Sequence, residues 1–447
     1  MKDKTVAIIG GGFAGLAAAV ALAETGYKVT VFERRAALGG RAYSFIESIT
    51  GDVLDNGQHL LMGCYHETFK FLRKLGTAHL VNLQQRPRVD FIDVEGKQTF
   101  LECPKLPAPL HLLFGLFRLK GIPIRDKLGF LRLGNQLRID TNRLRKQLAS
   151  LTVDQWLDAY DQSKTARKRF WEMLCVATIN LDPAQAAAVL LAEVLRRSFG
   201  SSYEDACLGL PATGLSQLYT EQARYYIEQR GGNVRLRTPV KKLLISSDCC
   251  LGLQTERGET FTADYYISAV PHLALKEILP AELFNQPYFA AWKNFKTSPI
   301  VSINLWFDKP ITELGFVGLV QGRIQWLFNK NLLFKHCNKD KYLVSCVISA
   351  ATNYSSSNKN DLVSLALEDL ANFFPSVRTA KLLNAVVVKE QHATFRATVD
   401  AEASRPKHKS PVNNLFLAGD WTDTGLPATI ESAVLSGHKC AQLVSAL

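Results

Sequence analysis

The sequence lacks the features of a membrane-spanning, secreted or zinc-binding protein. No apolar run reaches the roughly 20 residues that a transmembrane helix needs. The first strand-like run begins at Thr5, which leaves no room for a signal peptide. The nine cysteines, an odd number, include no C-x-x-C pair and no zinc-ligand spacing. We therefore expect an intracellular, cytoplasmic protein with reduced, mostly buried thiols and no metal site.

The composition is that of a large globular protein with a basic balance. The chain has 447 residues, of which 47% are hydrophobic and 21% charged, so it can form two domains with a sizeable core. Its formal net charge is +12. A charge of this sign indicates an anionic partner, either nucleic acid or a membrane surface.

The first forty residues carry the strongest motif. Residues 5–9 are rich in β-branched side chains and predict a buried strand, while the alanine-rich residues 16–25 predict a helix. Residues 10–15 between them fit G-x-G-x-x-G, and residues 28–33 predict a second strand that ends in an acid. Strand, glycines, helix, strand and acid in this order predict a dinucleotide-binding βαβ unit.

Each glycine of this motif, and the acid at its end, has a physical task. Gly10 allows a tight turn, Gly12 lets a pyrophosphate approach the backbone, and Gly15 lets the helix pack close to the strand. Unpaired N–H groups at the helix start attract phosphates. We expect Glu33, eighteen residues after Gly15, to accept hydrogen bonds from an adenosine ribose.

A second glycine-rich segment follows the second strand. Gly39, Gly40 and Arg41 suit a loop over a pyrophosphate, to which Arg41 would donate charge-assisted hydrogen bonds. The alternative is an ordinary exposed glycine turn. The position directly after the strand favours a role in binding.

The C-terminal end returns to nucleotide-binding chemistry. Residues 414–421 predict a buried strand that ends in Gly419 and Asp420, followed by a helix. We expect Asp420 to bind ribityl or phosphate-linked hydroxyl groups. Thr429 can cap the helix, whose free N–H groups would then point at a ligand.

Residues 55–65 place polar side chains between apolar runs. Such a stretch can pass a cofactor ring with its backbone N–H groups and hold His59 towards a substrate. The alternative is a hairpin in which Asp55, Asn56 and Gly57 make the turn. The residues alone slightly favour the hairpin.

Residues 104–146 differ in composition from the rest of the chain. Ten Lys or Arg stand against two acids, which gives +8 of the total +12. Apolar residues recur twice at the spacing of one helix face: Leu110, Leu113, Phe114 and Phe117, then Phe130, Leu133 and Leu137. Basic residues lie between them: Arg118, Lys120, Arg125, Lys127 and Arg132.

An apolar face beside a basic rim is typical of a helix at a membrane surface. Nucleic acid is less favoured, because the aromatic residues are phenylalanines on the apolar faces rather than interleaved stacking platforms. The alternative is a pair of core helices with a solvated basic back. We expect residues 104–146 to face an anionic membrane, with no nucleic-acid partner.

Taken together, G-x-G-x-x-G, the terminal acid, the Gly-Gly-Arg loop and the C-terminal L-F-L-A-G-D resemble the flavin-dependent amine oxidase and phytoene desaturase superfamily. The resemblance covers essentially the whole chain. It implies an α/β fold with a Rossmann-type FAD-binding domain and an inserted α+β substrate domain. The FAD-binding domain would comprise residues 1-65, 205-271 and 405-447, and the substrate domain residues 66-204 and 272-404.

The resemblance also implies where FAD binds. The cofactor would lie extended, with its adenosine at Glu33 and its flavin ring near Gly57 and Thr429. Further cofactor contacts are implied for a set of residues along this path: Ala14, Arg34, Gln58, His59, Val240 and Ile430.

Within the superfamily, residues 55–59, 393–395 and 419–431 are most similar to the squalene-associated FAD-dependent desaturase group. Its members are hydroxysqualene dehydroxylases of bacterial squalene and hopanoid synthesis. Amine oxidases usually carry a lysine near flavin N5; its place falls near Ser302, and no lysine is there. This departure places amine oxidation in doubt.

The expected activity is therefore the FAD-dependent reduction of hydroxysqualene to squalene, on the inner face of the cytoplasmic membrane. Alternatives are a carotenoid or phytoene desaturase or isomerase, and an isoprenoid escort protein without flavin, against which the intact nucleotide-binding residues argue. His59 is the first choice for the catalytic acid and Asp423 the second; His59 can instead make a structural hydrogen bond to FAD. The electron donor is not identified.

Overall fold

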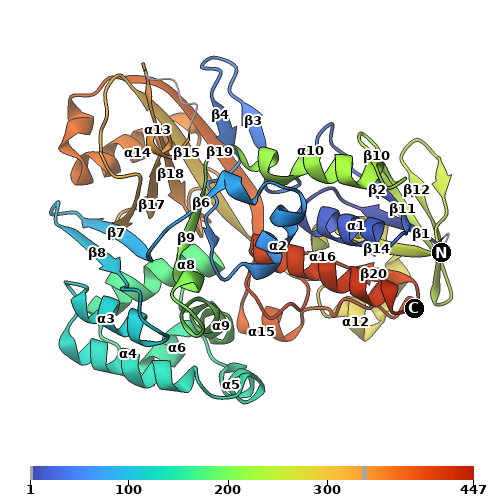
Figure 1. The fold of residues 1–447 in the computed structure, drawn as a ribbon, viewed down its shortest axis with the longest axis horizontal. Coiled ribbons are helices and arrows are strands. Elements are labelled where there is room, and N and C mark those ends of the chain that lie inside the picture. Colours follow the sequence, from blue (N-terminus) through green and yellow to red (C-terminus); the bar gives the residue numbers. More distant parts are fainter. Residues whose placement is uncertain (1–3, 335–339) are drawn as a thin grey trace.

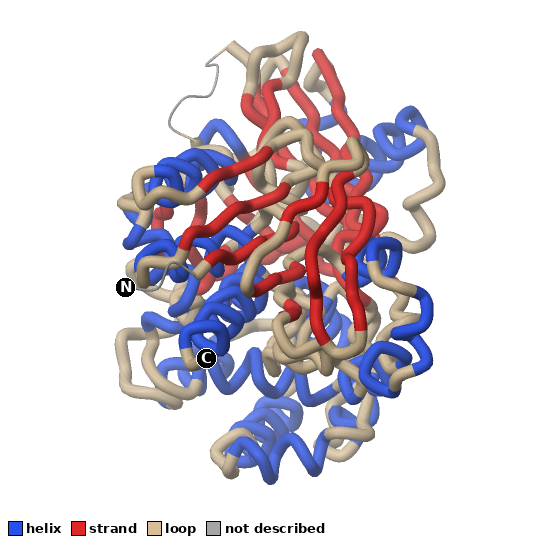
Figure 2. Tube along the Cα trace, turned by 90° about the vertical axis from the view of Figure 1, so that its right-hand side faces the viewer, coloured by secondary structure: helices blue, strands red, loops and turns tan. Residues whose placement is uncertain are grey.

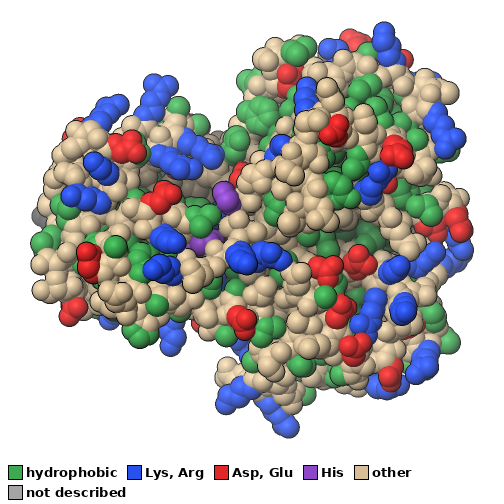
Figure 3. All heavy atoms as spheres, turned by 180° about the vertical axis from the view of Figure 1, so that it is seen from behind, with side chains coloured by type: hydrophobic (Ala, Val, Ile, Leu, Met, Phe, Trp, Pro, Cys, Tyr) green, Lys and Arg blue, Asp and Glu red, His purple; other side chains and the backbone are tan. Residues whose placement is uncertain are grey.

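The computed structural model describes residues 4–334 and 340–447. The described chain divides into two halves (Figure 1). One half holds both ends of the chain and a parallel sheet; the other holds a large, mostly antiparallel sheet and a group of helices. Figure 2 shows the long strands of the large sheet side by side. Seen from behind, a recess separates the two halves, and Lys and Arg side chains are spread over both (Figure 3).

The parallel sheet has five strands in the order β10-β2-β1-β14-β20. They are β1 (Thr5–Ile9), β2 (Lys28–Phe32), β10 (Asn233–Arg235), β14 (Tyr265–Ser268) and β20 (Leu415–Leu417). All neighbours pair in parallel, so the carboxyl ends of the strands meet at one edge. This is the Rossmann-type half that the sequence predicts.

Three helices pack on this sheet: α1 (Phe13–Glu24), α10 (Leu215–Glu228) and α16 (Ile430–Ser445). The helix α2 (His66–Lys74) joins the same core through Phe71 and Leu72. The predicted domain boundary after residue 65 therefore falls too early, because α2 packs against α16 in the nucleotide-binding half. A smaller sheet flanks this half: β11 (Val240–Ser246), β12 (Cys249–Thr255) and β13 (Thr260–Phe261).

The second large sheet has seven strands in the order β19-β15-β18-β17-β16-β7-β8. Its strands are β7 (Arg88–Asp93), β8 (Gln98–Glu102), β15 (Thr297–Phe307), β16 (Phe316–Val320), β17 (Trp326–Asn329), β18 (Tyr342–Ile348) and β19 (Leu382–Phe395). Val301, Ile303, Leu305 and Phe307 of β15 lie on one buried face, in a core shared with α14 (Lys359–Phe373). The side chains between them face the other half of the molecule.

Helices cover one end of this sheet, at the lower left of Figure 1. They are α3 (Leu110–Arg118), α4 (Ile124–Gln136), α5 (Thr141–Leu148), α6 (Val153–Asp158), α7 (Lys164–Ala166), α8 (Glu172–Ile179) and α9 (Ala188–Phe199). None of the helices in the described residues is both long enough and apolar enough to cross a membrane.

Short elements complete the fold. Two small sheets are formed by β3 (Ser44–Ile46) with β4 (Val53–Asp55), and by β5 (Leu61–Met62), β9 (Leu208–Pro211) and β6 (Val81–Leu83). Short helices are α11 (His272–Ile278), α12 (Pro287–Ala290), α13 (Lys330–Leu333) and α15 (Val399–Ala403). The described cysteines are free thiols, all but the half-buried Cys249 buried; Cys337 lies outside the described residues.

Candidate functional site

The glycine-rich turn between β1 and α1 has the geometry that the motif requires. Gly10 adopts φ +107°, a conformation that other residues rarely reach. A Cβ added at Gly15 would lie 1.9 Å from the Gly10 carbonyl oxygen, so the close contact of helix and strand admits no side chain there. At Gly12 such a Cβ would contact backbone atoms of Gly39 and Gly40 at 3.6–4.0 Å, so the second glycine loop packs on this turn.

Glu33 lies buried at the end of β2, directly beneath this turn. Its carboxylate accepts hydrogen bonds from the backbone N–H groups of Gly11 (2.8 Å) and Arg35 (2.9 Å). A carboxylate has about four lone-pair sites, so acceptor capacity remains for ribose hydroxyls. The strand that begins at Val240 is brought here as well, because Thr238 donates its N–H to the Glu33 carbonyl oxygen (2.9 Å).

The two arginines that follow Glu33 differ in their surroundings. Arg34 is exposed, whereas Arg35 donates from its guanidinium to the Gly40 carbonyl oxygen (2.9 Å) and so ties the second glycine loop to the first. Gly40 approaches Gly12 closely, since a Cβ on Gly40 would lie 3.1 Å from the Gly12 Cα. The Gly-Gly-Arg segment thus covers the dinucleotide turn, as the sequence predicts.

Arg41 connects this loop to two distant parts of the chain. Its guanidinium donates to the Ala393 carbonyl oxygen (2.9 Å) at the end of β19 and forms an ion pair with Asp420 after β20. Both side chains are largely shielded from solvent. The two residues predicted to bind the pyrophosphate and the ribityl chain are therefore in direct contact, which suits a cofactor that runs alongside the pair.

The loop after β20 is held by an arginine that the sequence reasoning missed. Arg405 is fully buried and pairs with Glu402 (2.9 Å). It also donates to the carbonyl oxygens of Asp420 (2.9 Å) and Leu426 (2.7 Å) and to the Thr424 hydroxyl (3.0 Å). No local pattern marks Arg405, because its partners lie up to 21 residues away.

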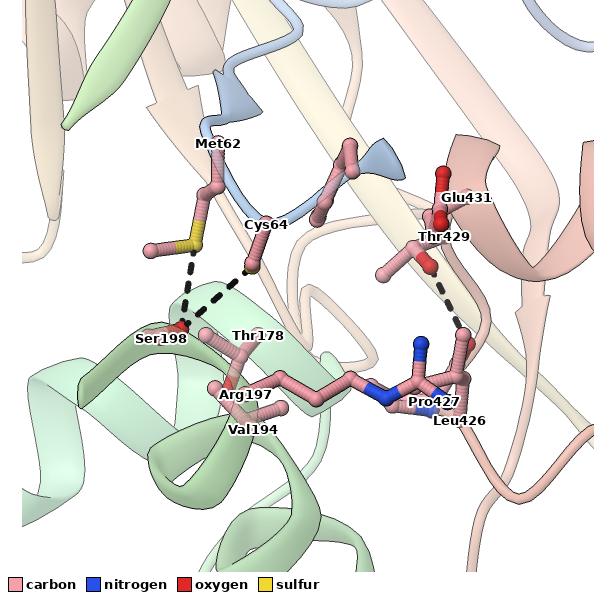
Figure 4. A pocket seen from close by; sticks show the side chains of 11 residues that line it. Met62, Cys64, Thr178, Val194, Arg197, Ser198, Leu426, Pro427, Thr429 and Glu431 are labelled. Carbon is pink, nitrogen blue, oxygen red and sulfur yellow. Dashed lines mark hydrogen bonds between the residues drawn. The ribbon is translucent and has the colours of Figure 1, made fainter. Parts of the chain in front are cut away.

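Thr429 caps α16 as predicted. Its hydroxyl oxygen accepts a hydrogen bond from the Ser432 N–H (3.1 Å), so the positive end of the helix dipole is turned towards the loop. A pocket with about 370 Å³ of empty space, partly open to solvent, adjoins this helix start (Figure 4). Its lining is mostly apolar: Met62, Cys64, Tyr65, Thr178, Val194, Arg197, Ser198, Leu426, Pro427, Thr429 and Glu431.

Figure 4 shows how the two halves meet around this pocket. Met62 and Cys64, on one side, both point to the Ser198 hydroxyl of α9, each at 3.7 Å. Arg197 of the same helix extends along the opposite edge towards Pro427. An apolar chamber with one cation and a helix start at its rim suits an apolar ligand beside a polar ring.

Residues 55–59 do not form the hairpin that the sequence slightly favours. Strand β4 pairs with β3, and the next strand, β5, pairs with β9, so Asp55, Asn56 and Gly57 leave one sheet for another. A Cβ on Gly57 would lie 3.7 Å from the Ser302 hydroxyl oxygen and 3.9 Å from His59 Nε2. Gly57, His59 and β15 therefore meet at one point, and no lysine stands at the place of Ser302.

Burial governs the protonation of His59. Burial lowers the pKa of its imidazole, the Asp55 carboxylate opposes this, and the cations Lys330 and Arg41 lower the pKa further. Asp423, the second choice for the acid, lies elsewhere: it is partly exposed, 3.9 Å from Arg145. The structure thus groups His59, and not Asp423, with Gly57 and Ser302.

The residues present fit a flavin dinucleotide. The amide atoms of the Gln58 side chain and the Ser302 hydroxyl are buried without a protein hydrogen-bond partner, although most buried polar groups have one. They lie where a ring with carbonyl and N–H groups would satisfy them. The start of α1 after the glycine turn and the capped start of α16 match phosphates at one end and an electron-rich ring at the other.

Comparison with known proteins agrees with this geometry. The model of the family described as flavin containing amine oxidoreductase matches residues 13–445. The chain belongs to this family. It is therefore an FAD-dependent oxidoreductase, and the cofactor predicted from the sequence is confirmed at the level of the family.

Relatives with this family's architecture align over nearly the full length of the chain. The chain is 31% identical to the hydroxysqualene dehydroxylase of Rhodopseudomonas palustris, over 99% of both proteins. It is 27% identical to the hydroxysqualene dehydroxylase of Zymomonas mobilis, over 98% of both. The 15-cis-phytoene desaturase of Synechococcus elongatus is 24% identical over 99% of this chain and 96% of that protein.

Solved structures share the fold at lower identity. An oxidoreductase from Methanosarcina mazei superposes with a TM-score of 0.76 at 20% identity, over 98% of this chain and all of the other. A putrescine oxidase gives a TM-score of 0.73 at 16% identity, over 99% of both chains. These likenesses confirm the predicted fold class.

Proposed function

We propose that this FAD-dependent oxidoreductase reduces hydroxysqualene to squalene. The observation that carries the proposal is the apolar wall beside His59. Leu60 and Met62, which follow His59 in the chain, pack against a cluster formed by Leu208 of β9 and three residues of the large sheet: Phe316, Phe328 and Val347. A titratable side chain at the edge of a hydrocarbon-lined surface matches a substrate that has one hydroxyl group in an otherwise apolar chain.

This apolar surface continues towards the helical end of the molecule. Val89 and Trp326 contact both the cluster beside His59 and the main core, which includes Leu116 of α3. The apolar wall beside His59 and the core beneath α3 therefore form one continuous packed surface.

The chemistry follows from the poor leaving ability of hydroxide. Loss of an allylic hydroxyl group as water requires a proton, which His59 would donate to the oxygen. When bound in its reduced form, FAD supplies the hydride for the resulting allylic cation. The apolar wall would exclude water that would otherwise capture the cation. The start of α16 would favour negative charge on the reduced flavin ring.

Two features of the site separate this reaction from those of other family members. The position that would hold a lysine in amine oxidases is Ser302, which supports hydrocarbon chemistry rather than amine oxidation. Similarity to hydroxysqualene dehydroxylases at 31% and 27% identity supports the reductive reaction over desaturation. Desaturation remains the second candidate, because a phytoene desaturase aligns at 24%.

The test is an anaerobic assay with chemically reduced enzyme and hydroxysqualene, in which squalene should form as the flavin absorbance returns. The same enzyme in oxidised form is given phytoene in parallel. Desaturated product from phytoene, without squalene from hydroxysqualene, would replace the proposal with the second candidate. Binding of both isoprenoids without turnover of either would indicate an escort protein.

We also propose that the α3–α4 hairpin docks on an anionic membrane. Five large apolar side chains of this hairpin are exposed, up to 63% for Ile124: Leu110, Phe114, Phe117, Ile124 and Leu128. Exposed basic residues surround them: Arg118, Lys120, Arg125 and Arg132. Apolar side chains flanked by cations complement acyl chains beneath anionic headgroups.

Part of the predicted membrane face belongs instead to the core. Phe130 and Leu133 are only 5% and 2% exposed, so α4 turns this face inward. Lys127 is also buried, and its ammonium group donates to the carbonyl oxygens of Phe117 (2.8 Å) and Leu119 (2.7 Å) at the end of α3. The sequence predicted a membrane-facing apolar surface on both helices, and the residues it chose on α4 belong to the core.

Sedimentation with liposomes of anionic lipid tests this surface. Replacement of Phe114, Phe117 and Ile124 by Ser should release the protein, since each side chain contributes up to roughly 1.5–3 kcal/mol when buried in lipid. High salt should weaken binding of the unmodified protein. The matched control is Phe130→Ser, which should lower the melting temperature instead. Unchanged sedimentation of the triple variant would refute the docking surface.

A further inference from the structure

A buried ion pair joins the two halves of the molecule directly beneath the reacting end. Lys330, at the start of α13, places its ammonium nitrogen 3.2 Å from an Asp55 carboxylate oxygen at the end of β4. The two side chains are 1% and 2% exposed. Lys330 directly follows β17 of the sheet that forms the apolar wall, and Asp55 precedes the loop that carries Gly57 and His59.

Asp55 and Asn56 are fixed by hydrogen bonds to the nucleotide-binding half. The Asp55 carboxylate also accepts from the Ser44 hydroxyl (2.8 Å) and the Leu215 N–H (2.9 Å). The Asn56 side chain donates to the Arg41 carbonyl oxygen (2.9 Å). Every one of these bonds lies just before Gly57, so they set the path of the chain into the site. From the other half, Lys330 contacts Asp55 and Glu390 accepts a hydrogen bond from the Asn56 amide.

The sheet face beneath this loop carries more polar groups than packing requires. Ser302 and Asn304 of β15 and Ser345 of β18 are all buried, and Ser345 pairs with Asn304 across the strands. Burying an ion pair costs free energy, and an apolar pair of similar volume is often as stable or more so. A wall for hydrocarbon has no need of a lysine at this position. The charge therefore indicates a role in the reaction.

We propose that Lys330 and Asp55 are positioning residues, which hold the Gly57–His59 loop against the substrate-binding sheet and set the electrostatic environment of His59. The inference rests on the proposed function only as far as His59 acts as the proton donor. The effect on His59 itself can be measured in the oxidised, FAD-loaded protein without substrate.

The two members of the pair act on His59 in opposite directions. The Asp55 carboxylate raises the pKa of His59, while the Lys330 ammonium lowers it. Arg41 also lowers it, and its charge is offset by its ion pair with Asp420. Glu390, 3.5 Å from the Asn56 amide, is the remaining charged group at this loop. Removal of Lys330 should thus raise the pKa of His59, and removal of Asp55 should lower it.

The experiment is a pH titration of the FAD-loaded protein followed by NMR of isotopically labelled histidine, with the His59 signal assigned from His59→Gln. Lys330→Gln removes the cation and keeps a hydrogen-bond donor for Asp55; Asp55→Asn removes the anion and keeps an acceptor. The pKa of His59 should rise in the first variant and fall in the second, each by about one pH unit. Lys330→Arg should leave it near the unmodified value.

The control is Lys309→Met, which removes an exposed lysine that is bonded to Thr379 at the far end of β15. It should leave the titration unchanged. Shifts in the same direction for Lys330→Gln and Asp55→Asn, or no shift in either, would overturn the proposal. Loss of FAD in both, with no rescue by Lys330→Arg, would also overturn it and leave the pair a purely structural contact.

Failure of the proposal and failure of the proposed function give different results. If the protein does not reduce hydroxysqualene but the two shifts are opposite, the pair still positions His59 for another reaction. If hydroxysqualene is reduced and the shifts are absent, the function stands without the pair. In the expected case, Asp55→Asn lowers kcat for hydroxysqualene about tenfold at neutral pH, because the lowered pKa of His59 reduces its protonated fraction, and leaves KM nearly unchanged.

Discussion

The adenosine end of the site comes from one continuous stretch, residues 10–41, whereas the ring end draws Gly57, Ser302, Lys330 and Thr429 from both halves of the molecule. At the predicted adenosine end, glycines at fixed spacing shape the backbone. At the predicted ring end, side chains from distant segments come together. The same cofactor can therefore be held by a local motif while its reaction is set by distant residues.

The largest effect should come from filling the backbone contact at the adenosine end. In Gly15→Ala, the new methyl group would lie 1.9 Å from the Gly10 carbonyl oxygen, so α1 must move away from β1. We expect purified protein without flavin absorbance and a lower melting temperature, with a destabilisation at or above the usual range of about 1–3 kcal/mol for overpacking.

Gly134→Ala is the matched control for this clash. Gly134 lies within α4, and a Cβ there would meet no atom within 4 Å. Alanine in a helix interior is favoured over glycine by roughly 1 kcal/mol, so this variant should be slightly more stable and retain FAD. If Gly15→Ala bound FAD as well as Gly134→Ala does, the local motif would not be the cofactor site.

A smaller loss is expected for Arg405→Met, which tests the distant support of the ring end. The substitution leaves Arg145 (3.3 Å) as the ion-pair partner of Glu402 and removes the donor to the carbonyl oxygens of Asp420 and Leu426. Leaving a buried acceptor unsatisfied costs about 1–3 kcal/mol. FAD content and melting temperature should fall together. Equal stability of the variant would show that the loop after β20 folds without Arg405.

The same contrast explains how far sequence reasoning reached. Gly10, Gly12, Gly15 and Gly40 were found because the chain must turn or approach closely there, and such needs are local. Arg405 and Lys330 were missed, since each is defined by partners far along the chain. Sequence spacing gives no sign of such contacts.

Residues 104–146, which the sequence predicts to face a membrane, show a second limit of sequence reasoning. Helical spacing identified apolar faces on both α3 and α4, but spacing cannot tell which face is covered. Phe114 is exposed and Phe130 is buried, although both belong to sets with the same periodicity. The difference arises from packing, because Phe130 contacts Phe170 and Trp171 at the far side of the helical group.

At the ring end, His59→Gln should separate catalysis from binding. Proton donation by a positioned side chain contributes about 10²–10⁴-fold, so turnover by pre-reduced enzyme should fall at least about 100-fold with FAD content intact. Loss of FAD instead would make His59 a binding residue, and full turnover would remove it from the mechanism.

The pH dependence of the unmodified enzyme sharpens the same prediction. His59 must carry a proton to donate one, and burial lowers the pKa of His59 below 6.5. Turnover by pre-reduced enzyme should therefore be highest at acidic pH and decline as pH rises through that lowered pKa. A rate that increases from acidic to neutral pH would contradict His59 as the acid.

The smallest expected effect returns to the adenosine end, at Glu33. In Glu33→Ala the ribose loses an acceptor, at a cost of about 1–3 kcal/mol for a charged hydrogen bond left unmade. Because Glu33 also holds the N–H groups of Gly11 and Arg35, part of any loss reflects the turn itself. Calorimetry with two partial ligands separates the contributions: ADP carries the adenosine ribose and FMN does not. We expect ADP affinity to fall and FMN affinity to stay nearly constant; an equal loss for both ligands would mean that Glu33 braces the turn and leaves the ribose to other residues.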